Sequence, residues 1–242
     1  TNISLSDIEN HKKALNFFLD KNFNIIRIGD QFSKNFNFHN DNFLDLTKKK
    51  VGLTHYNQAY IFQKCEFFFG NVTPGVYMSR FFAKEFALTN CPHEDMLYNS
   101  FSNSNQNLAL FKSIYCLKKK RILTIPEIFK DEELLFNIQL DKKKFINIEN
   151  TQDEILELSE IFYKKNILKK AEENVYFNEF NDLRKKTLDN LMKNKALMNN
   201  PTTNKRLYLC KQNYYSKIHI PDKFLKENIE LSKSLKEKSE KI

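Results

Sequence analysis

The chain lacks several patterns that mark membrane-spanning, secreted and metal-binding proteins. No apolar run reaches the length of about 18 residues that a membrane-spanning helix requires, and no basic-then-apolar leader opens the chain. The four cysteines lie far apart and form no C-x-x-C pair, so we expect free thiols in a reducing cytoplasm and no structural zinc. The five histidines form neither an H-x-x-H nor an H-E-x-x-H pattern. We also find no internal repeat and no glycine- or serine-rich linker.

Glycine and tryptophan are scarce, whereas lysine, asparagine, isoleucine and phenylalanine are abundant. The 242 residues include 4 glycines and no tryptophan, but 23 phenylalanines, and the net charge is +9. A basic chain suits an anionic partner such as a nucleotide diphosphate, a nucleic acid or an acidic membrane. An AT-rich genome gives the same composition whatever the function, and we prefer this explanation because the lysines are spread along the chain. The hydrophobic content of 41% is enough for one core, and the length favours one or two domains.

The first 70 residues alternate between helical and strand patterns. Residues 5–20 have apolar positions near the helical period, with Ser6 as the expected N-cap and Glu9 at the capping-box spacing. Residues 24–28 and 43–46 are strand-like, and a loop rich in asparagine and phenylalanine separates them. Residues 55–64 then predict a helix, and residues 65–69 a continuous apolar strand.

The same rhythm continues to residue 165. We expect a helix over 76–86, a strand over 87–90, a polar loop over 91–107, a strand or irregular segment over 108–124, a short helix near Pro126 and a strand over 145–148. Asn150 or Thr151 is expected to cap a further helix to about Lys165, and Glu154 lies at the capping-box spacing from Thr151. Such alternation is typical of an α/β fold with a Rossmann-like parallel sheet. We therefore predict an α/β domain over residues 1–165 and a charged helical extension over residues 166–242.

The turn after the triple-phenylalanine strand is the first candidate binding site. Ligands of open α/β sheets collect at the carboxyl edge, and the first turn of the next helix offers N–H groups and a positive dipole end to a phosphate. The candidate residues are Asn71, Thr73, Pro74, Gly75 and Val76. An ordinary helix start without a ligand explains the same residues.

The second candidate lies in the strand before it. A charged side chain such as Arg27 is costly in an apolar strand unless it is paired or functional. Arg27 could hold a diphosphate through two N–H groups, and Asp30, which follows Gly29, could orient it or accept a ligand hydroxyl. A purely structural Arg–Asp pair is the alternative. Asn90 also ends a strand at the expected ligand edge, where forming the turn is its alternative role.

Taken in order, these motifs resemble a family of bacterial glycosyltransferases encoded in surface-polysaccharide gene clusters. The family phrases are an opening like RNSDIENY, then YKVIRMGD, FIDY, CKFFIGxxSG, a strand ending in Asn, ENTPEEI and IPxxFLxxN; they match residues 1–10, 23–30, 43–46, 65–75, 87–90, 149–155 and 220–228. Two departures stand out. Asn57-Gln58 replaces an acidic residue of many relatives, and Thr73-Pro74-Gly75 replaces a plain Ser-Gly.

The resemblance implies a domain of the GT-B C-terminal type, the half that binds the nucleotide-sugar donor. It implies sugar transfer to a cell-surface glycan or lipid-linked glycan, as in lipopolysaccharide biosynthesis, in the cytoplasm or peripherally at the inner face of the membrane. The catalytic base and the acceptor site would come from an N-terminal domain that this chain does not include. No D-x-D pair stands near a strand end, so we expect no metal and no further cofactor.

Two other functional classes stay open. The chain could be a non-catalytic nucleotide- or glycan-binding module that keeps only the fold. It could also be a basic nucleic-acid-binding protein, which would need exposed aromatic rings in a basic groove. Most phenylalanines lie on expected helix or strand faces, so we expect a core role for them and no nucleic-acid partner. The lysine-rich end could contact an anionic membrane, although a solvated helix face explains it equally simply.

Overall fold

The computed structural model describes residues 6–29, 33–47, 55–98, 106–136, 140–170, 175–212 and 220–242, and has a mixed α/β fold with parallel sheets. Its strands are β1 (Ile25–Arg27), β2 (Phe43–Asp45), β3 (Phe67–Asn71), β4 (Glu85–Cys91), β5 (Leu108–Phe111), β6 (Ser113–Cys116), β7 (Arg121–Ile122) and β8 (Phe145–Ile148). Its helices are η1 (Ile8–His11), α1 (Lys12–Asp20), α2 (His55–Lys64), α3 (Pro74–Phe81), α4 (Asp95–Tyr98), α5 (Ile125–Lys130), α6 (Glu132–Phe136), α7 (Gln152–Phe162), η2 (Tyr163–Ile167), α8 (Val175–Lys193), α9 (Lys195–Met198), α10 (Pro201–Gln212), α11 (Asp222–Ile229) and α12 (Lys233–Glu240).

The first five strands pair in parallel, as the alternating sequence pattern predicts. β1 pairs with β2, and β3, β4 and β5 form a three-stranded sheet in that order. The last three strands instead form an antiparallel sheet in the order β7-β6-β8. The turn between β6 and β7 spans only residues 117–120, and so short a connection allows only an antiparallel hairpin. The parallel sheet therefore ends at β5.

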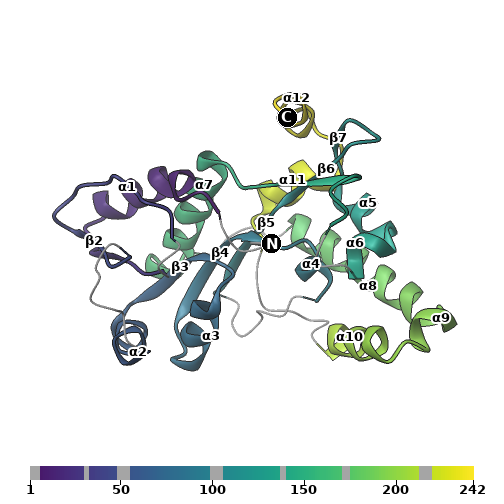
Figure 1. Cartoon of the computed structure of the whole chain (residues 1–242), viewed down its shortest axis with the longest axis horizontal. Helices are drawn as coiled ribbons and strands as arrows, with labels where there is room; N and C mark the ends of the chain where they lie inside the picture. Colours follow the sequence, from purple (N-terminus) through teal and green to yellow (C-terminus); the bar gives the residue numbers. More distant parts are fainter. Residues whose placement is uncertain are drawn as a thin grey trace.

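Side chains of β3 alternate between the two faces of the central sheet. The rings of Phe67 and Phe69 contact Phe18 of α1, and Phe67 also contacts Phe162 of α7. The ring of Phe68 contacts α2 instead, at Phe62. Because successive side chains of a strand point to opposite faces, α1 and α7 cover one face and α2 covers the other, in agreement with their positions above and below the strands (Figure 1).

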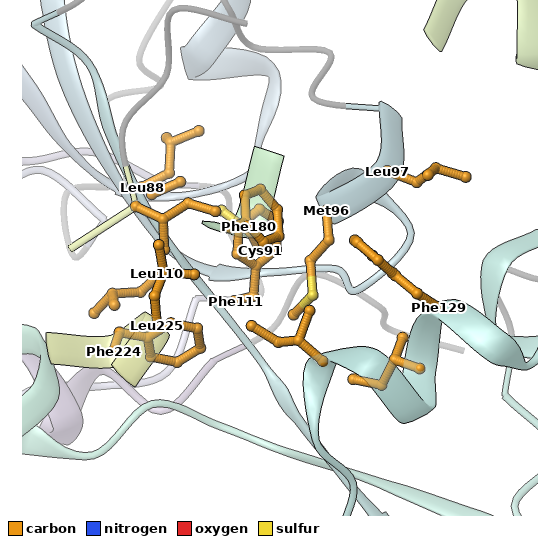
Figure 2. Close-up of a cluster of buried hydrophobic side chains, with 14 of the residues drawn as sticks. Leu88, Cys91, Met96, Leu97, Leu110, Phe111, Phe129, Phe180, Phe224 and Leu225 are labelled. Carbon is orange, nitrogen blue, oxygen red and sulfur yellow. The ribbon is translucent and has the colours of Figure 1, made fainter. Parts of the chain in front are cut away.

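The C-terminal helices belong to the same hydrophobic core as the parallel sheet. Figure 2 shows Leu88 and Leu110 of the sheet beside Phe180 of α8 and Leu225 of α11. Arg184 of α8 is almost fully buried, and its Nε donates to the carbonyl oxygen of Leu97 at 2.8 Å. Buried side chains of α8, α10 and α11 thus belong to the same hydrophobic core as the parallel sheet.

Helix starts follow local capping chemistry, with one correction near the N-terminus. Thr151 and Glu154 form the predicted capping box at the start of α7, and Thr124 and Glu127 form another at the start of α5. The N-cap near the chain start is Asp7, whose carboxylate accepts from the N–H of Glu9, and not Ser6. Ser6 is instead bonded to Asn71.

The other differences between prediction and structure concern where helices and strands begin and end. The helix expected over 76–86 begins earlier, with Pro74 in its first turn, and ends at Phe81. β4 accordingly starts before the predicted strand, at Glu85. The short helix α4 lies within the segment expected to be loop.

The last helix, α12, closes one edge of the antiparallel sheet. The hydroxyl oxygen of Ser239 accepts a hydrogen bond from the N–H of Ile122 at 2.9 Å. Lys238 donates to Ser113 of β6 and forms an ion pair with Glu154 at 2.9 Å. Within the described residues, none of the helices combines the length and the apolar character that crossing a bilayer demands.

Candidate functional site

Polar side chains gather where the parallel strands end. β1 ends at Arg27, β3 at Asn71, and β4 near Thr89 and Asn90. Together with residues from η1 and from the segment before α7 they form two neighbouring hydrogen-bonded sets, which we call the edge network. One set contains Ser6, His11, Asn71, Thr89, Asn90 and Asn150. The other contains Asp7, Asn10, Arg27, Lys34, Asp45 and Glu149. This edge is where open α/β sheets bind ligands.

Asn71 is the centre of the edge network. Its amide nitrogen donates to the hydroxyl of Ser6. Its amide oxygen accepts from the hydroxyl of Thr89 at 2.7 Å and from the side-chain nitrogen of Asn90 at 3.4 Å. A single strand-ending residue therefore joins the chain start to the end of the neighbouring strand.

His11 joins the edge network through Thr89, which is also bonded to Asn71. Its Nε2 lies 3.0 Å from the hydroxyl oxygen of Thr89. Because Thr89 uses its one proton toward Asn71, Nε2 of His11 carries the proton of this bond. Burial, and to a smaller extent the nearby positive charge of Arg27, lower the pKa of His11 from 6.5 to about 4. The imidazole is therefore neutral at physiological pH.

Asn90 and Asn150 join β4 to the segment before α7. Each side-chain oxygen accepts the backbone N–H of the other residue, at 2.6 and 2.7 Å. The side-chain nitrogen of Asn150 also donates to the carbonyl oxygen of Phe111, at the end of β5. Asn90 has φ 53°, in the left-handed region, and the pairing of β4 with β5 is irregular between Leu88 and Cys91. Asparagine tolerates this conformation better than most residues, which explains a polar residue in a buried strand end.

Glu149 and Lys34 connect Asp7 with Asn10 and Arg27. Glu149 accepts from the backbone N–H of Asp7 and from the side-chain nitrogen of Asn10. Lys34 forms an ion pair with Asp7 at 2.7 Å, and its carbonyl oxygen accepts from Arg27. The side chains of Lys34 and Asp7 are 58% and 42% exposed, so this part of the network faces solvent.

Arg27 is paired with Asp45, a carboxylate that the sequence analysis did not single out. Its Nη1 lies 2.9 Å from Asp45 on the paired strand β2, and both side chains are about nine-tenths buried. Burial alone would raise the pKa of the Asp45 carboxyl, yet hydrogen bonds from Thr47 and the charge of Arg27 hold it below the usual value. Asp30, the partner considered from sequence, lies outside the described residues.

Arg27 lies close enough to His11 for its charge to affect the imidazole. His11 in turn contacts Thr89 and through it Asn71.

The other predicted residues have mainly packing roles. A Cβ on Gly29 would lie 2.3 Å from the hydroxyl of Ser33 and 3.0 Å from Thr47, so glycine allows the loop to fold closely here. A Cβ on Gly75 would lie 3.0 Å from the ring of Phe62. Thr73 is the N-cap of α3, without a side-chain cap bond.

Pro74 and Val76 limit what the first turn of α3 can offer a phosphate. Pro74 has no N–H. The Val76 side chain is fully buried, and its N–H donates to the carbonyl oxygen of Thr73 at 3.0 Å. Among Pro74, Gly75 and Val76, the N–H of Gly75 is therefore the donor best placed to meet an anion.

Sequence reasoning missed several residues of the edge network. His11, Thr89, Glu149 and Asn150 were not singled out, because nothing in their local pattern distinguishes a site residue from an ordinary turn or helix residue. For three of them a usable signal was their place in the matched phrases: Thr89 precedes Asn90, and Glu149 and Asn150 open the phrase before α7.

A second pair of titratable groups follows β4. Nδ1 of His93 lies 3.5 Å from Oε2 of Glu94, and both side chains are buried. Burial lowers the pKa of His93 to about 4 and raises that of Glu94 to about 7. Among the described residues, no group of three or more histidine, cysteine or acidic side chains could hold a metal ion.

Comparisons with known proteins give no family or fold assignment. Protein-family models, curated proteins and solved structures were each compared with the chain, and none matched significantly. The functional argument therefore depends on the geometry of the site and on the sequence resemblance.

Proposed function

We propose that this chain is the donor-binding part of a glycosyltransferase that moves a sugar from a nucleotide-sugar to a cell-surface glycan. One observation carries the proposal. Each of the six matched phrases between residues 1 and 155 contributes at least one residue to the edge network. Ordered phrases that are distant in sequence thus meet at the sheet edge where such ligands bind.

The finer fold is part of this proposal. Three parallel strands, with α3 connecting β3 to β4, are compatible with a Rossmann-like domain of the GT-B C-terminal type. In such a domain the donor diphosphate lies over the carboxyl edge. Arg27 and the N–H of Gly75 would contact the diphosphate, and Asn71, Thr73 and Asn90 would accept or donate to the sugar and its phosphates.

A non-catalytic nucleotide- or glycan-binding module is the second candidate. The observation that favours it is that the polar groups of the edge network are bonded largely to one another. A transferase must release some of these bonds to its substrate, whereas a module that keeps only the fold need not. Sugar transfer or slow donor hydrolysis, measured beside binding, distinguishes the two.

The test is calorimetric titration of the protein with UDP-, GDP- and CMP-sugars. We expect one of the three to bind with a Kd below millimolar, and Arg27→Lys to weaken it about 10-fold, because lysine cannot bind a diphosphate through two N–H groups. Arg121→Lys is the matched control, since Arg121 is also paired with a carboxylate, Glu127, but lies on β7. The proposal is wrong if no donor binds at millimolar concentration, or if Arg27→Lys and Arg121→Lys have the same affinity as the native protein.

A further inference from the structure

The antiparallel sheet brings two basic turns together, far from the edge network. Cys116 of β6 pairs with Arg121 of β7 on one side and with Phe145 of β8 on the other. The turns at residues 117–120 and 141–144 therefore lie at the same end of this sheet. The N–H of Leu117 donates to the carbonyl oxygen of Lys144 at 2.9 Å, which joins them. Figure 1 shows β6 and β7 on the opposite side of the molecule from α2 and β2.

Seven cationic side chains belong to this end of the sheet, which we call the lysine end: Lys118, Lys119, Lys120, Arg121, Lys142, Lys143 and Lys144. Arg121 and Lys119 form ion pairs with Glu127, and Lys144 with Glu133 and Asp141. Within the described part of the chain, the other four lysines form no ion pair, and all four are exposed. The lysine end thus has uncompensated positive charge.

A small pocket opens among these lysines. Its volume is about 270 Å³, and its lining includes the buried side chains of Cys116, Leu123 and Phe145. The polar lining residues are Lys118, Lys119, Glu127, Asp131, Lys143 and Lys144. An apolar floor below a cationic rim suits a ligand group that carries a negative charge on an apolar stem.

Exposed apolar side chains flank the same end. Leu117, in the first turn, is 39% exposed, and Ile146, two residues beyond Lys144, is 40% exposed. Ile146 is the cross-strand neighbour of Tyr115, and Leu117 follows Tyr115 by two residues, so both lie on the face of the sheet opposite to Cys116 and Phe145 of the pocket. Leucine and isoleucine beside lysines are the composition of surfaces that rest on a bilayer.

We propose that the lysine end is a docking surface for a bilayer rich in anionic phospholipid. A lipid headgroup phosphate enters the lysine-rimmed pocket, the unpaired lysines meet neighbouring headgroups, and Leu117 enters the interface. Nucleic acid fits less well. The lysine end has a single arginine, which is already paired with Glu127, and its pocket offers only the buried ring of Phe145 for base stacking. This inference does not depend on the proposed transferase activity.

The test is co-sedimentation of the full chain with vesicles of neutral phosphatidylcholine alone or with phosphatidylglycerol added to about one third. We expect binding to the anionic vesicles only, weakening as salt is raised. Each lysine near such a surface contributes about a 5-fold gain in affinity, so Lys118→Gln/Lys142→Gln/Lys143→Gln should weaken binding about 100-fold. Lys120, whose φ is 51°, is left unchanged to avoid altering the turn.

The matched control is Lys186→Gln/Lys205→Gln/Lys211→Gln, which removes three exposed lysines from α8 and α10. It should bind anionic vesicles within about 3-fold of the native protein, because those lysines lie away from the docking surface. Leu117→Ser should weaken binding several-fold without changing its salt dependence, since it removes only the apolar contribution. Thermal unfolding verifies that all variants are folded.

Four outcomes would overturn the proposal. They are no binding to anionic vesicles, equal binding to neutral vesicles, an equal loss in both triple variants, or displacement of bound protein by millimolar glycerol phosphate, which would indicate a soluble phosphate ligand. Tighter binding of RNA than of vesicles at equal salt, lost in the first triple variant, would assign the surface to nucleic acid instead.

Discussion

Asn90 and Asn150 exchange hydrogen bonds: each backbone N–H donates to the side-chain oxygen of the other residue. Both residues are buried, at 7% and 0% exposure. The exchange satisfies two backbone donors that leave the regular pairing at the end of β4 and just before α7. It therefore fixes the position of α7 relative to the sheet edge.

Replacing Asn90 should separate the effect of its side-chain hydrogen bonds from the effect of its positive φ. Asn90→Gly loses the side-chain bonds, and we expect it to lower the free energy of unfolding by about 1–3 kcal/mol because the buried N–H of Asn150 is left unpaired. Asn90→Ala loses the same bonds but keeps a β-carbon at a positive φ, as the native asparagine does, so it should be about 1–2 kcal/mol less stable than Asn90→Gly. Urea denaturation measures both.

A double-mutant cycle with Asn150→Ala completes this test. The two residues form one unit, so the double variant should be less destabilised than the sum of the single variants. Additive losses would show that the exchange is not coupled.

Acidification should destabilise the protein partly through His11. Burial lowers the pKa of His11 from 6.5 to about 4, so between these values the unfolded chain binds a proton that the folded chain does not. This proton uptake by the unfolded chain lowers the free energy of unfolding. The loss begins below pH 6.5 and reaches about 3 kcal/mol as pH falls to 4.

His11→Gln is the informative variant, because the glutamine amide can still donate to Thr89 while it cannot titrate. Its free energy of unfolding should fall less than that of the native protein between pH 7 and pH 4.5. The exposed His39→Gln serves as control and should follow the native curve. A native-like slope in His11→Gln would contradict the assignment.

The parallel strands and most helix starts were predictable, because their signals are local. Signals that span only a few residues predict these conformations. Examples are the capping box of Thr151 and Glu154 and the apolar runs around Phe68 and Leu88. The antiparallel sheet was not predictable, because β6 and β7 are short and their pairing depends on a hairpin turn made of lysines. The membership of α8 and α11 in the main core was also hidden, since their charged faces dominate the pattern.

The Cys65 thiol should react first with alkylating reagents. Cys65 is partly exposed, whereas Cys91, Cys116 and Cys210 are buried. Burial raises the pKa of Cys91 well above its usual value and that of Cys210 to about 12, which removes the reactive thiolate. Mass spectrometry after brief iodoacetamide treatment should show Cys65 modified at least about 10-fold faster than Cys91. Equal rates would contradict the buried placement of β4.

Glu127→Gln should remove charge pairing while keeping the helix cap, because glutamine also completes a capping box. Hydrogen bonds from Arg121 hold the pKa of Glu127 well below its usual value, although burial opposes this. The stability due to this shift is present above about pH 4.5 and is lost as pH falls below it. Native protein should thus lose more stability than Glu127→Gln between pH 5 and pH 3, as measured by thermal unfolding.

Glu133→Gln is the matched control for Glu127→Gln, since Glu133 pairs with Lys144 in a more exposed ion pair. Its acid response should remain close to that of the native protein. Identical curves for all three proteins would show that the Arg121–Glu127 pair contributes nothing.

The geometry around the candidate site was predictable only in part. The apolar strands ending in Arg27, Asn71 and Asn90 indicated one sheet edge; Asn71 and Asn90 do meet, whereas Arg27 belongs to the separate pair of β1 and β2. The partner of Arg27 could not be identified, because Asp45 is brought beside it only by the pairing of β1 with β2. The first turn of α3, which looked like the phosphate site, is partly closed by Val76 packing inward.

The contact between Ser239 and Ile122 has a consequence for how the protein behaves in a crowded solution. β7 is a strand at the margin of its sheet, and an uncovered margin invites strands of other molecules to join it. By occupying the N–H of Ile122 and lying across β7, α12 prevents such joining. A chain shortened before Lys233 would therefore tend to form intermolecular β-structure and aggregate, even if the rest of its fold survived.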